Sequence, residues 1–136
     1  MPVYSSVLHG NLDAKGRPEQ VLLSSMLSVR NTDLRHSLTV TTVDYYDSTG
    51  RLLRRHLSKP QSVQPLGTAD FFVENREIQG GTGANFIVVW YSEQPIDQPL
   101  LETVHVYHWG TQSQAFTSRG QVLHVPVPVP DPARGP

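Results

Sequence analysis

Apolar and polar residues alternate with a period of two along much of the chain. In the segment 20–31, one face carries Val21, Leu23, Ser25, Leu27 and Val29, and the other carries Ser24, Ser28 and Arg30. This period predicts a β-strand with one buried face, because successive side chains of a strand point to opposite sides. Residues 38–47 are mostly β-branched or aromatic and are followed by "DSTG", where Gly50 can take the positive φ of a hairpin loop. Residues 51–57 then form the return strand.

Similar patterns predict further strands at residues 3–9, 70–74, 85–92, 102–109 and 121–125. Turn-forming residues separate them, in "AKGRP", "RNTD", "KPQS", "QPLG", "EQPIDQP" and "SRG". No segment has ten or more residues of helical period. We therefore predict an all-β fold, an antiparallel immunoglobulin-like β-sandwich of seven to eight strands, with a small barrel as the alternative.

The strand at residues 38–47 contains a change of register. Leu38 and Val40 alternate in one register, whereas Val43 and Tyr45 alternate in the other. A single flat strand cannot bury all four on one face. A β-bulge near residues 41–42 would resolve the conflict. The alternative is a central strand that is covered on both faces.

The apolar faces of the predicted strands define a core and a second apolar surface. The residues predicted to be largely buried are Leu23, Leu27, Val29, Val40, Phe86, Val88, Trp90, Val104 and Val106. Residues 85–91 are apolar on both faces, and residues 100–109 are so in part through Leu101, Tyr107 and Trp109. Because one face of a sandwich sheet needs only one covering layer, the second face could meet another copy of the chain. We therefore predict a possible homo-oligomer.

The 136 residues are enough for one domain with its own core. We assign residues 1–125 to a single β-sandwich domain and residues 126–136 to a Pro-rich extended tail. Alternate prolines in "VPVPVPDPARGP" cannot donate to a strand ladder, which favours an extended, polyproline-like chain. We interpret this segment as a disordered tail or a vector remnant, and a docking segment for an aromatic groove is the alternative.

Composition argues against several classes of partner. Eleven basic and twelve acidic side chains give a net charge of −1, so no overall field attracts nucleic acid or an anionic membrane. The basic run at residues 51–59 has no interleaved aromatic residues for stacking on bases, and we expect it to protect an edge strand. No apolar run approaches the roughly 20 residues of a membrane span. We expect no nucleic-acid partner and no membrane insertion by this chain.

Four motifs in order carry a family resemblance. They are "SVRNTD" (28–33), "VTTVDYYDSTGRLLR" (40–54), "GGTGANFIVVW" (80–90) and "FTSRG" (116–120). Together they resemble the successive motifs of domain of unknown function family 3124, a bacterial family of small, often exported or lipid-anchored proteins. The resemblance extends over about residues 3–125. It implies an exported protein of the periplasm or cell envelope, with a signal peptide taken to be absent from this chain.

The family has no assigned activity, so the resemblance implies no catalytic residues. It draws attention to the glycine loop with Asn85 and Phe86, and to the segment 117–120. The chain departs from the family in "VENREIQGG" (73–81), where Arg76 stands among the acids. A cation site built from those acids is therefore not expected.

Three glycines, Gly80, Gly81 and Gly83, come directly before a predicted strand. The loop lacks the lysine and hydroxyl of a P-loop and the spacing of a dinucleotide fingerprint. A phosphate cradle also needs a helix N-terminus after the loop, and here a strand follows. We predict a tight turn in which the glycines provide positive φ or close backbone approach. A backbone-lined binding site is the alternative.

Catalytic and metal sites are not indicated. His105 and His108 are three residues apart on a predicted strand and so point to opposite faces, which prevents them from binding one ion. Ser118 lies near His124 in sequence, but no serine sits in a "GxSxG" elbow. The absence of cysteine removes disulfides, thiolate nucleophiles and thiolate metal sites. We predict no metal, no cofactor and no catalytic residue.

Two functions follow as hypotheses. The first is a non-catalytic binding or assembly module of the bacterial cell envelope, with a protein partner. The second is a small-molecule binding protein, or an enzyme of unrecognised type, with a site for an anionic ligand at the glycine loop. The ligand-binding residues predicted for that site are Gly80, Gly81, Gly83, Asn85, Thr117, Ser118 and Arg119.

The predicted anion site combines backbone and side-chain donors. The glycine turn could present several backbone N–H groups to an anion, and the planar Arg119 guanidinium could bind a carboxylate or phosphate through two hydrogen bonds. A competing hypothesis gives Arg119 a structural role, in which it pairs with Glu74, Glu77 or Glu102 and ties a loop down.

Overall fold

A computed structural model of the chain describes residues 1–123, which form eleven strands and no helix. The strands are β1 (Pro2–Val3), β2 (Ser6–Leu12), β3 (Pro18–Leu22), β4 (Ser24–Arg30), β5 (Leu38–Tyr46), β6 (Leu52–Arg55), β7 (Gln61–Val63), β8 (Thr68–Val73), β9 (Ala84–Tyr91), β10 (Leu100–Trp109) and β11 (Gln112–Arg119). Within the described part of the chain, no helix is long and apolar enough to cross a membrane.

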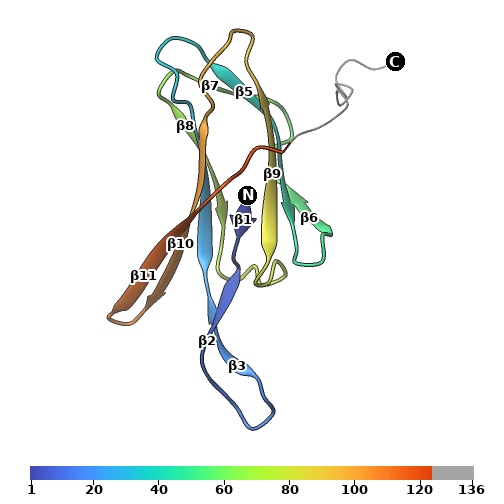
Figure 1. Ribbon diagram of the computed structural model, residues 1–136, viewed down its shortest axis with the longest axis vertical. Helices are drawn as coiled ribbons and strands as arrows, with labels where there is room; N and C mark the ends of the chain where they lie inside the picture. Colours follow the sequence, from blue (N-terminus) through green and yellow to red (C-terminus); the bar gives the residue numbers. More distant parts are fainter. Residues whose placement is uncertain (124–136) are drawn as a thin grey trace.

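All strand pairs are antiparallel, and they form three sheets (Figure 1). A five-stranded sheet has the order β1-β9-β5-β6, with β7 also paired to β5. A four-stranded sheet has the order β11-β10-β4-β8, and β2 pairs only with β3. The all-β prediction is confirmed. Neither larger sheet closes on itself within residues 1–123, so the barrel alternative is not formed.

The two larger sheets share one hydrophobic core. The five-stranded sheet contributes Leu38, Val40, Val43, Tyr45 and Phe86, and the four-stranded sheet contributes Leu27, Val29, Ala69, Phe71 and Val73. The strand count exceeds the predicted seven to eight, partly because β1 and β7 have only two and three residues. Strands this short carry no period that can be recognised in a sequence.

The β-bulge predicted in β5 is present. The register against β9 shifts between Val40 and Thr42, so that Thr41 is the additional residue. As a result Val40 and Val43, which are three apart, are both completely buried. The bulge brings the two registers of β5 onto one face, as its hydrophobic pattern requires.

The prediction that Val104 and Val106 belong to the core is wrong. Val104 is only half-buried and Val106 is 40% exposed, because the opposite face of β10 points inward. The pairing with β4 determines this orientation, since Leu27 lies directly opposite Thr103. Direct partners share a face, and Leu27 is completely buried. The inward positions of β10 are therefore Thr103 and His105, both of which are fully buried.

The C-terminal part also differs from the prediction. Residues 118–120, expected to be a turn, belong to β11 up to residue 119, whereas residues 121–123, expected to begin a strand, do not form one. β11 is an edge strand in which every residue except Ser118 is exposed, so its sequence has no apolar alternation. The boundary predicted at residue 125 and the tail at 126–136 lie outside the described residues, as does His124.

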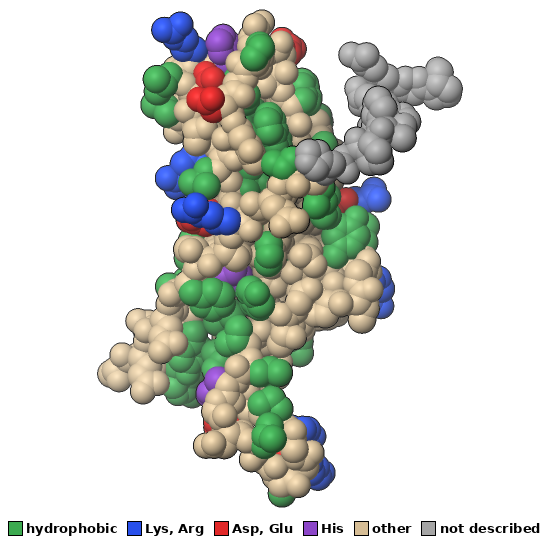
Figure 2. Space-filling view, viewed as in Figure 1, with side chains coloured by type: hydrophobic (Ala, Val, Ile, Leu, Met, Phe, Trp, Pro, Cys, Tyr) green, Lys and Arg blue, Asp and Glu red, His purple; other side chains and the backbone are tan. Residues whose placement is uncertain are grey.

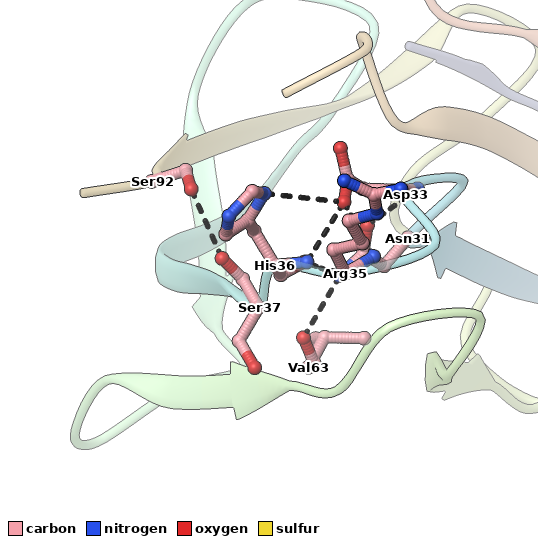
Figure 3. A network of polar contacts seen from close by, with 7 residues as sticks. All are labelled: Asn31, Asp33, Arg35, His36, Ser37, Val63 and Ser92. Carbon is pink, nitrogen blue, oxygen red and sulfur yellow. Dashed lines mark hydrogen bonds and ion pairs between the residues drawn. The ribbon is translucent and has the colours of Figure 1, made fainter. Parts of the chain in front are cut away.

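The "SVRNTD" motif organises the connection from β4 to β5 (Figure 3). The buried Asn31 amide donates to the carbonyl oxygens of His36 and Val63, at 2.9 and 3.1 Å, and its oxygen accepts from the Asp33 N–H. Asp33 in turn accepts from the N–H groups of Arg35 and His36. These bonds satisfy a turn that would otherwise leave buried backbone groups unpaired. The residues of the "SVRNTD" motif therefore have a structural role in this connection.

The β5–β6 hairpin is built as predicted. Gly50 has a φ of 86°. One Asp47 oxygen accepts from the N–H groups of Thr49 and Arg51 and from the Thr49 hydroxyl, and these bonds hold the pKa of Asp47 below its usual value. β6 lies at the end of its sheet with Arg54 and Arg55 exposed, which confirms that the basic run covers a sheet edge.

Candidate functional site

The glycine turn uses its backbone groups in packing. Ser48 donates from its N–H and from its hydroxyl to the Gly80 carbonyl, at 3.0 and 2.9 Å. The Gly81 carbonyl accepts from the N–H of Ser5, and the Gly83 N–H donates to the Ser48 hydroxyl. The turn therefore joins the start of β9 to the β5–β6 loop and to the segment after β1.

Two of the glycines are required by the geometry of this turn. A Cβ on Gly80 would collide with the hydroxyl oxygens of Tyr45 and Ser5, which are hydrogen-bonded to each other at 2.7 Å. Gly81 has a φ of 76°, which side chains disfavour. Gly83 has room for a Cβ at ordinary contact distance from Ser48. The prediction of a tight turn with close backbone approach is confirmed.

Strand β1 links the two predicted ligand-binding segments. The Ser118 hydroxyl of β11 donates to the Pro2 carbonyl at 2.6 Å, and Pro2 lies opposite Asn85 of β9. Asn85 donates from its side-chain amide to the Gly83 carbonyl. Ser118 and Asn85 therefore lie on either side of the same short strand, which links β9 of the five-stranded sheet to β11 of the four-stranded sheet.

Thr117 and Arg119 lie on the opposite face of β11 from Ser118, because neighbouring residues of a strand alternate. Arg119 is directly opposite Glu102 of β10, and its Nε lies 3.9 Å from a Glu102 carboxylate oxygen. The competing prediction was that Arg119 pairs with one of three glutamates. In the structure, that glutamate is Glu102. The Arg119 side chain is 75% exposed, so this pair contributes little to stability. A ligand-binding role for these residues stays a prediction.

A groove of about 670 Å³ lies beside these residues, between the edge of β9 and the start of β10. Its walls come from Met1, Thr32, residues 86–90, residues 98–101 and residues 119–123. Val88 and Trp90 were predicted to be core residues, but they are half-buried because their inward side chains also line this groove. Most lining side chains are apolar, and among residues 1–123 one cationic side chain, Arg119, lines the groove.

One edge of β9 is open beside this groove. Phe86 is paired to Met1 through both backbone groups, its N–H donating to the Met1 carbonyl at 2.9 Å and its carbonyl accepting from the Met1 amine at 3.1 Å. Backbone groups of alternate residues point to the same side of a strand, so those of Val88 and Trp90 face the same edge. Among residues 1–123, none is hydrogen-bonded to this edge beyond Phe86. Sequence patterns do not reveal such an edge, because it depends on where β1 stops.

A buried histidine anchors the segment that follows β1. His105 is completely buried, and its Nε2 accepts from the Tyr4 N–H at 3.1 Å. Its ring stacks on Phe116 with centroids 4.5 Å apart. Burial lowers the pKa of His105, in agreement with a neutral ring whose Nε2 is an acceptor. His108 is exposed, which confirms that the two β10 histidines face opposite sides.

A second histidine, His56, is half-buried against the aromatic part of the core. The His56 ring contacts the rings of Tyr45, Phe71 and Phe86, and its buried Nε2 has no hydrogen-bond partner in the described part of the chain. Burial lowers the pKa of His56, and the nearby Arg54 charge lowers it further. The folded protein therefore holds both His56 and His105 in the neutral form near pH 7.

We expect stability to fall as the pH is lowered from 7.5 to 5.5. The folded-state pKa of each histidine lies below the value of 6.5 that it has when unperturbed. The unfolded chain then binds more protons than the folded chain, so the contribution is complete above about pH 6.5 and is lost below it. Thermal melts followed by circular dichroism test this. His56→Phe should reduce the dependence and the exposed-site control His108→Gln should preserve it, whereas a melting temperature that is equal or higher at pH 5.5 contradicts it.

The fold defines an all-β protein of antiparallel sheets, with a groove at the open edge of one sheet. The family model described as "Protein of unknown function (DUF3124)" matches residues 1–123, and the chain belongs to this family. Comparison with curated proteins and with solved structures found no match. The family resemblance of the four motifs is confirmed.

Proposed function

We propose that this protein is a non-catalytic binding module that takes up an extended segment of a partner protein along the open edge of β9. The observation that carries the proposal is the coincidence of this edge with an apolar groove. Strand addition obtains affinity from backbone hydrogen bonds and specificity from alternate side chains. Beside β9, the open edge offers the backbone groups and the apolar groove can receive the alternate side chains.

The backbone groups of Val88 and Trp90 supply two donors and two acceptors on the open edge. A strand that paired with them antiparallel to β9 would continue the line of β1, which already occupies Ala84 and Asn85. Its inward side chains would contact Trp90 and Leu101 in the groove. A partner with apolar residues at alternate positions fits this arrangement.

Arg119 adds a preference for charge at the rim of the groove. Its guanidinium is mostly exposed, and its nearest carboxylate, that of Glu102, is at the 3.9 Å limit of an ion pair. An acidic side chain of the partner could approach it without displacing a strong contact. We propose that the bound segment carries an acidic residue next to its apolar ones.

A second candidate function uses the same groove for an amphipathic anion. The combination of an apolar lining with the exposed Arg119 supports it. Of the ligand-binding residues predicted from the sequence, Arg119 lines this groove, whereas Gly80, Gly81 and Gly83 are engaged in the turn. Dodecanoate is a suitable probe, and Arg119→Gln should weaken its binding if this function is correct.

The cellular location of the module and the finer class of its fold are also proposals. We propose that the module acts in the bacterial cell envelope after export, as the family resemblance implies, and that its two layers are a variant of the immunoglobulin-like sandwich. The antiparallel pairing of every strand and the single core between the two larger sheets support the second point. Fractionation of the native host, with antibody detection of the protein, tests the first.

A proline at position 88 should abolish strand addition without unfolding the protein. The N–H of Val88 points to the open edge, so Val88→Pro removes no bond of the β5–β9 ladder, but it removes one donor and places a ring against the incoming strand. Peptides selected from a random dodecapeptide phage library on the wild-type protein should alternate apolar and polar residues. They should bind Val88→Pro at least about tenfold more weakly, a loss of about 1.4 kcal/mol.

The control is Tyr91→Ala, on the same strand, which removes a half-exposed side chain outside the groove lining and should leave peptide affinity unchanged. Melting curves verify that each variant is folded. Selected peptides that bind wild type and Val88→Pro equally would contradict strand addition. Binding of dodecanoate that depends on Arg119, without any peptide binding, would support the second function instead.

A further inference from the structure

Two hairpins project from the same end of the molecule (Figure 1), and residues of both line one cleft. One is the β2–β3 ribbon, which pairs with no other strand, and the other is the distal part of β10 and β11. The cleft has a volume of about 1170 Å³. Hydrophobic side chains gather between the two projections (Figure 2). We call this region the fork cleft.

The ribbon is apolar on both of its faces. Val7 and Val21 are direct partners that share one face, and both line the fork cleft. Leu8 follows Val7 in sequence and therefore lies on the opposite face, outside the cleft, where it is 57% exposed. Leu22, which follows Val21 and is 42% exposed, also borders the cleft. A two-stranded ribbon is marginal in water unless another layer covers it. This ribbon has two faces to cover, and no strand of residues 1–123 packs as a layer on the outer one.

The opposite wall of the cleft is aromatic. Tyr107 and Trp109 of β10 and Phe116 of β11 line it, and Trp109 is 74% exposed. Exposed aromatic residues at the edge of a cleft are typical anchors of protein interfaces, and the remaining lining of this cleft is mostly polar. The molecule therefore carries both a slot with an aromatic wall and a ribbon with an uncovered apolar face.

We propose that the fork cleft is filled by the β2–β3 ribbon of a second copy of this chain, in a two-fold symmetric dimer. In such a dimer each ribbon lies between the ribbon and the β10–β11 hairpin of the other copy. Val7 and Val21 then meet the same residues of the second copy near the two-fold axis. Leu8 and Leu22 meet Tyr107, Trp109 and Phe116. One symmetric contact thus covers both faces of both ribbons.

Charge and size agree with a second copy as the occupant. His9 and Glu19 are cross-strand partners on the cleft face, so a two-fold axis can place the His9 of one copy beside the Glu19 of the other. Asp13 and Arg17 pair near the ribbon tip. Sixteen residues line the cleft, and Leu8 and Leu12 extend this surface along the ribbon. Together, the number of these residues approaches the roughly 20–30 residues that each partner contributes to a stable interface.

This dimer does not depend on the proposed function, because the fork cleft and the β9 edge have no lining residue in common. Sedimentation of the full chain between about 1 μM and 1 mM should give a mass of twice 15.2 kDa at the upper end. Leu8→Lys and Trp109→Ala should each raise the dimer dissociation constant at least about 30-fold, as expected for interface anchors. Both side chains are mostly exposed in the single chain, so melting temperatures should change little.

The control is Phe72→Ser, which removes an equally exposed apolar side chain from β8, on another surface, and should not affect dimerisation. Because the chain has no cysteine, Val21→Cys provides a single thiol near the proposed axis and should form a covalent dimer on oxidation. Leu66→Cys, exposed on a loop outside the cleft, should not. A monomer mass at 1 mM, or a dimer that Leu8→Lys and Trp109→Ala leave unchanged, overturns the proposal.

Discussion

Phe86→Ala is expected to lower the free energy of unfolding by about 3–5 kcal/mol. The Phe86 side chain is completely buried at the centre of the five-stranded sheet and contacts the rings of Tyr45 and His56, at centroid distances of 5.1 and 5.5 Å. Truncation leaves a cavity between two sheets whose backbones are held by ladder hydrogen bonds, so they cannot close around it. Domains of this size have only about 5–15 kcal/mol of stability, and the variant should be close to unfolding.

Trp90→Ala on the same strand should cost less, about 1–2 kcal/mol, because part of the Trp90 ring already faces the groove. Periodicity alone predicts similar burial, and so similar losses, for the two residues. Urea unfolding of both variants followed by fluorescence and circular dichroism separates the two cases. Equal losses for Phe86→Ala and Trp90→Ala would mean that the groove is closed in solution.

Gly80→Ala is expected to lower the free energy of unfolding by about 2–4 kcal/mol. An added Cβ meets the hydroxyl oxygens of Tyr45 and Ser5 and must separate them or displace the turn. Overpacking of this kind costs about 1–3 kcal/mol, and loss of a buried hydroxyl pair adds about 1–3 kcal/mol. Thermal melts of the variant should show a decrease of roughly 8–16 °C for a domain of this length.

Gly83→Ala is the matched control, because the same Cβ there has only ordinary contact with Ser48 and should change stability by less than about 1 kcal/mol. Tyr45→Phe removes the nearer hydroxyl. In a double-mutant cycle, Gly80→Ala should therefore cost less in the Tyr45→Phe background than in the wild type. A cost of Gly80→Ala that is the same in both backgrounds would contradict the role assigned to the Tyr45 hydroxyl.

Patterns within single segments predicted the features that are decided locally. The conflict between Val40 and Val43 indicated either a bulge or a strand covered on both faces, and the structure has a bulge at Thr41. The sequence "DSTG" indicated a hairpin, and Gly50 has the positive φ that was expected. Glycines directly before a strand indicated a turn, and Gly80 has no room for a side chain. In each case the decisive contacts are close in sequence or follow from a strict two-residue period.

Features decided by pairing between distant strands were not predictable in the same way. β10 has apolar residues on both faces, so its own sequence did not reveal that Thr103 and His105 face inward. Its partner β4 decides this through Leu27. β11 is a polar edge strand held by β10 alone, and it has no apolar pattern to recognise.

The candidate site shows the same limit. Arg119 was predicted either to bind an anion or to pair with Glu74, Glu77 or Glu102, and the structure pairs it with Glu102. The groove itself was missed, because Val88 and Trp90 have the pattern of core residues. Whether such residues are covered depends on the length of β1, which ends its pairing with β9 at Phe86. A hydrophobic pattern identifies apolar surface but not the layer that covers it.

Amide hydrogen exchange along β9, measured by NMR, tests the central claim most directly. In the free protein, the N–H groups of Val88 and Trp90 should exchange much faster than those of Ile87 and Val89, which point toward β5. Addition of a selected peptide should protect Val88 and Trp90 at least about tenfold and leave the β5-facing amides unchanged. If all four amides are equally protected in the free protein, or if a bound peptide leaves Val88 and Trp90 unprotected, β9 has no open edge that binds a partner strand.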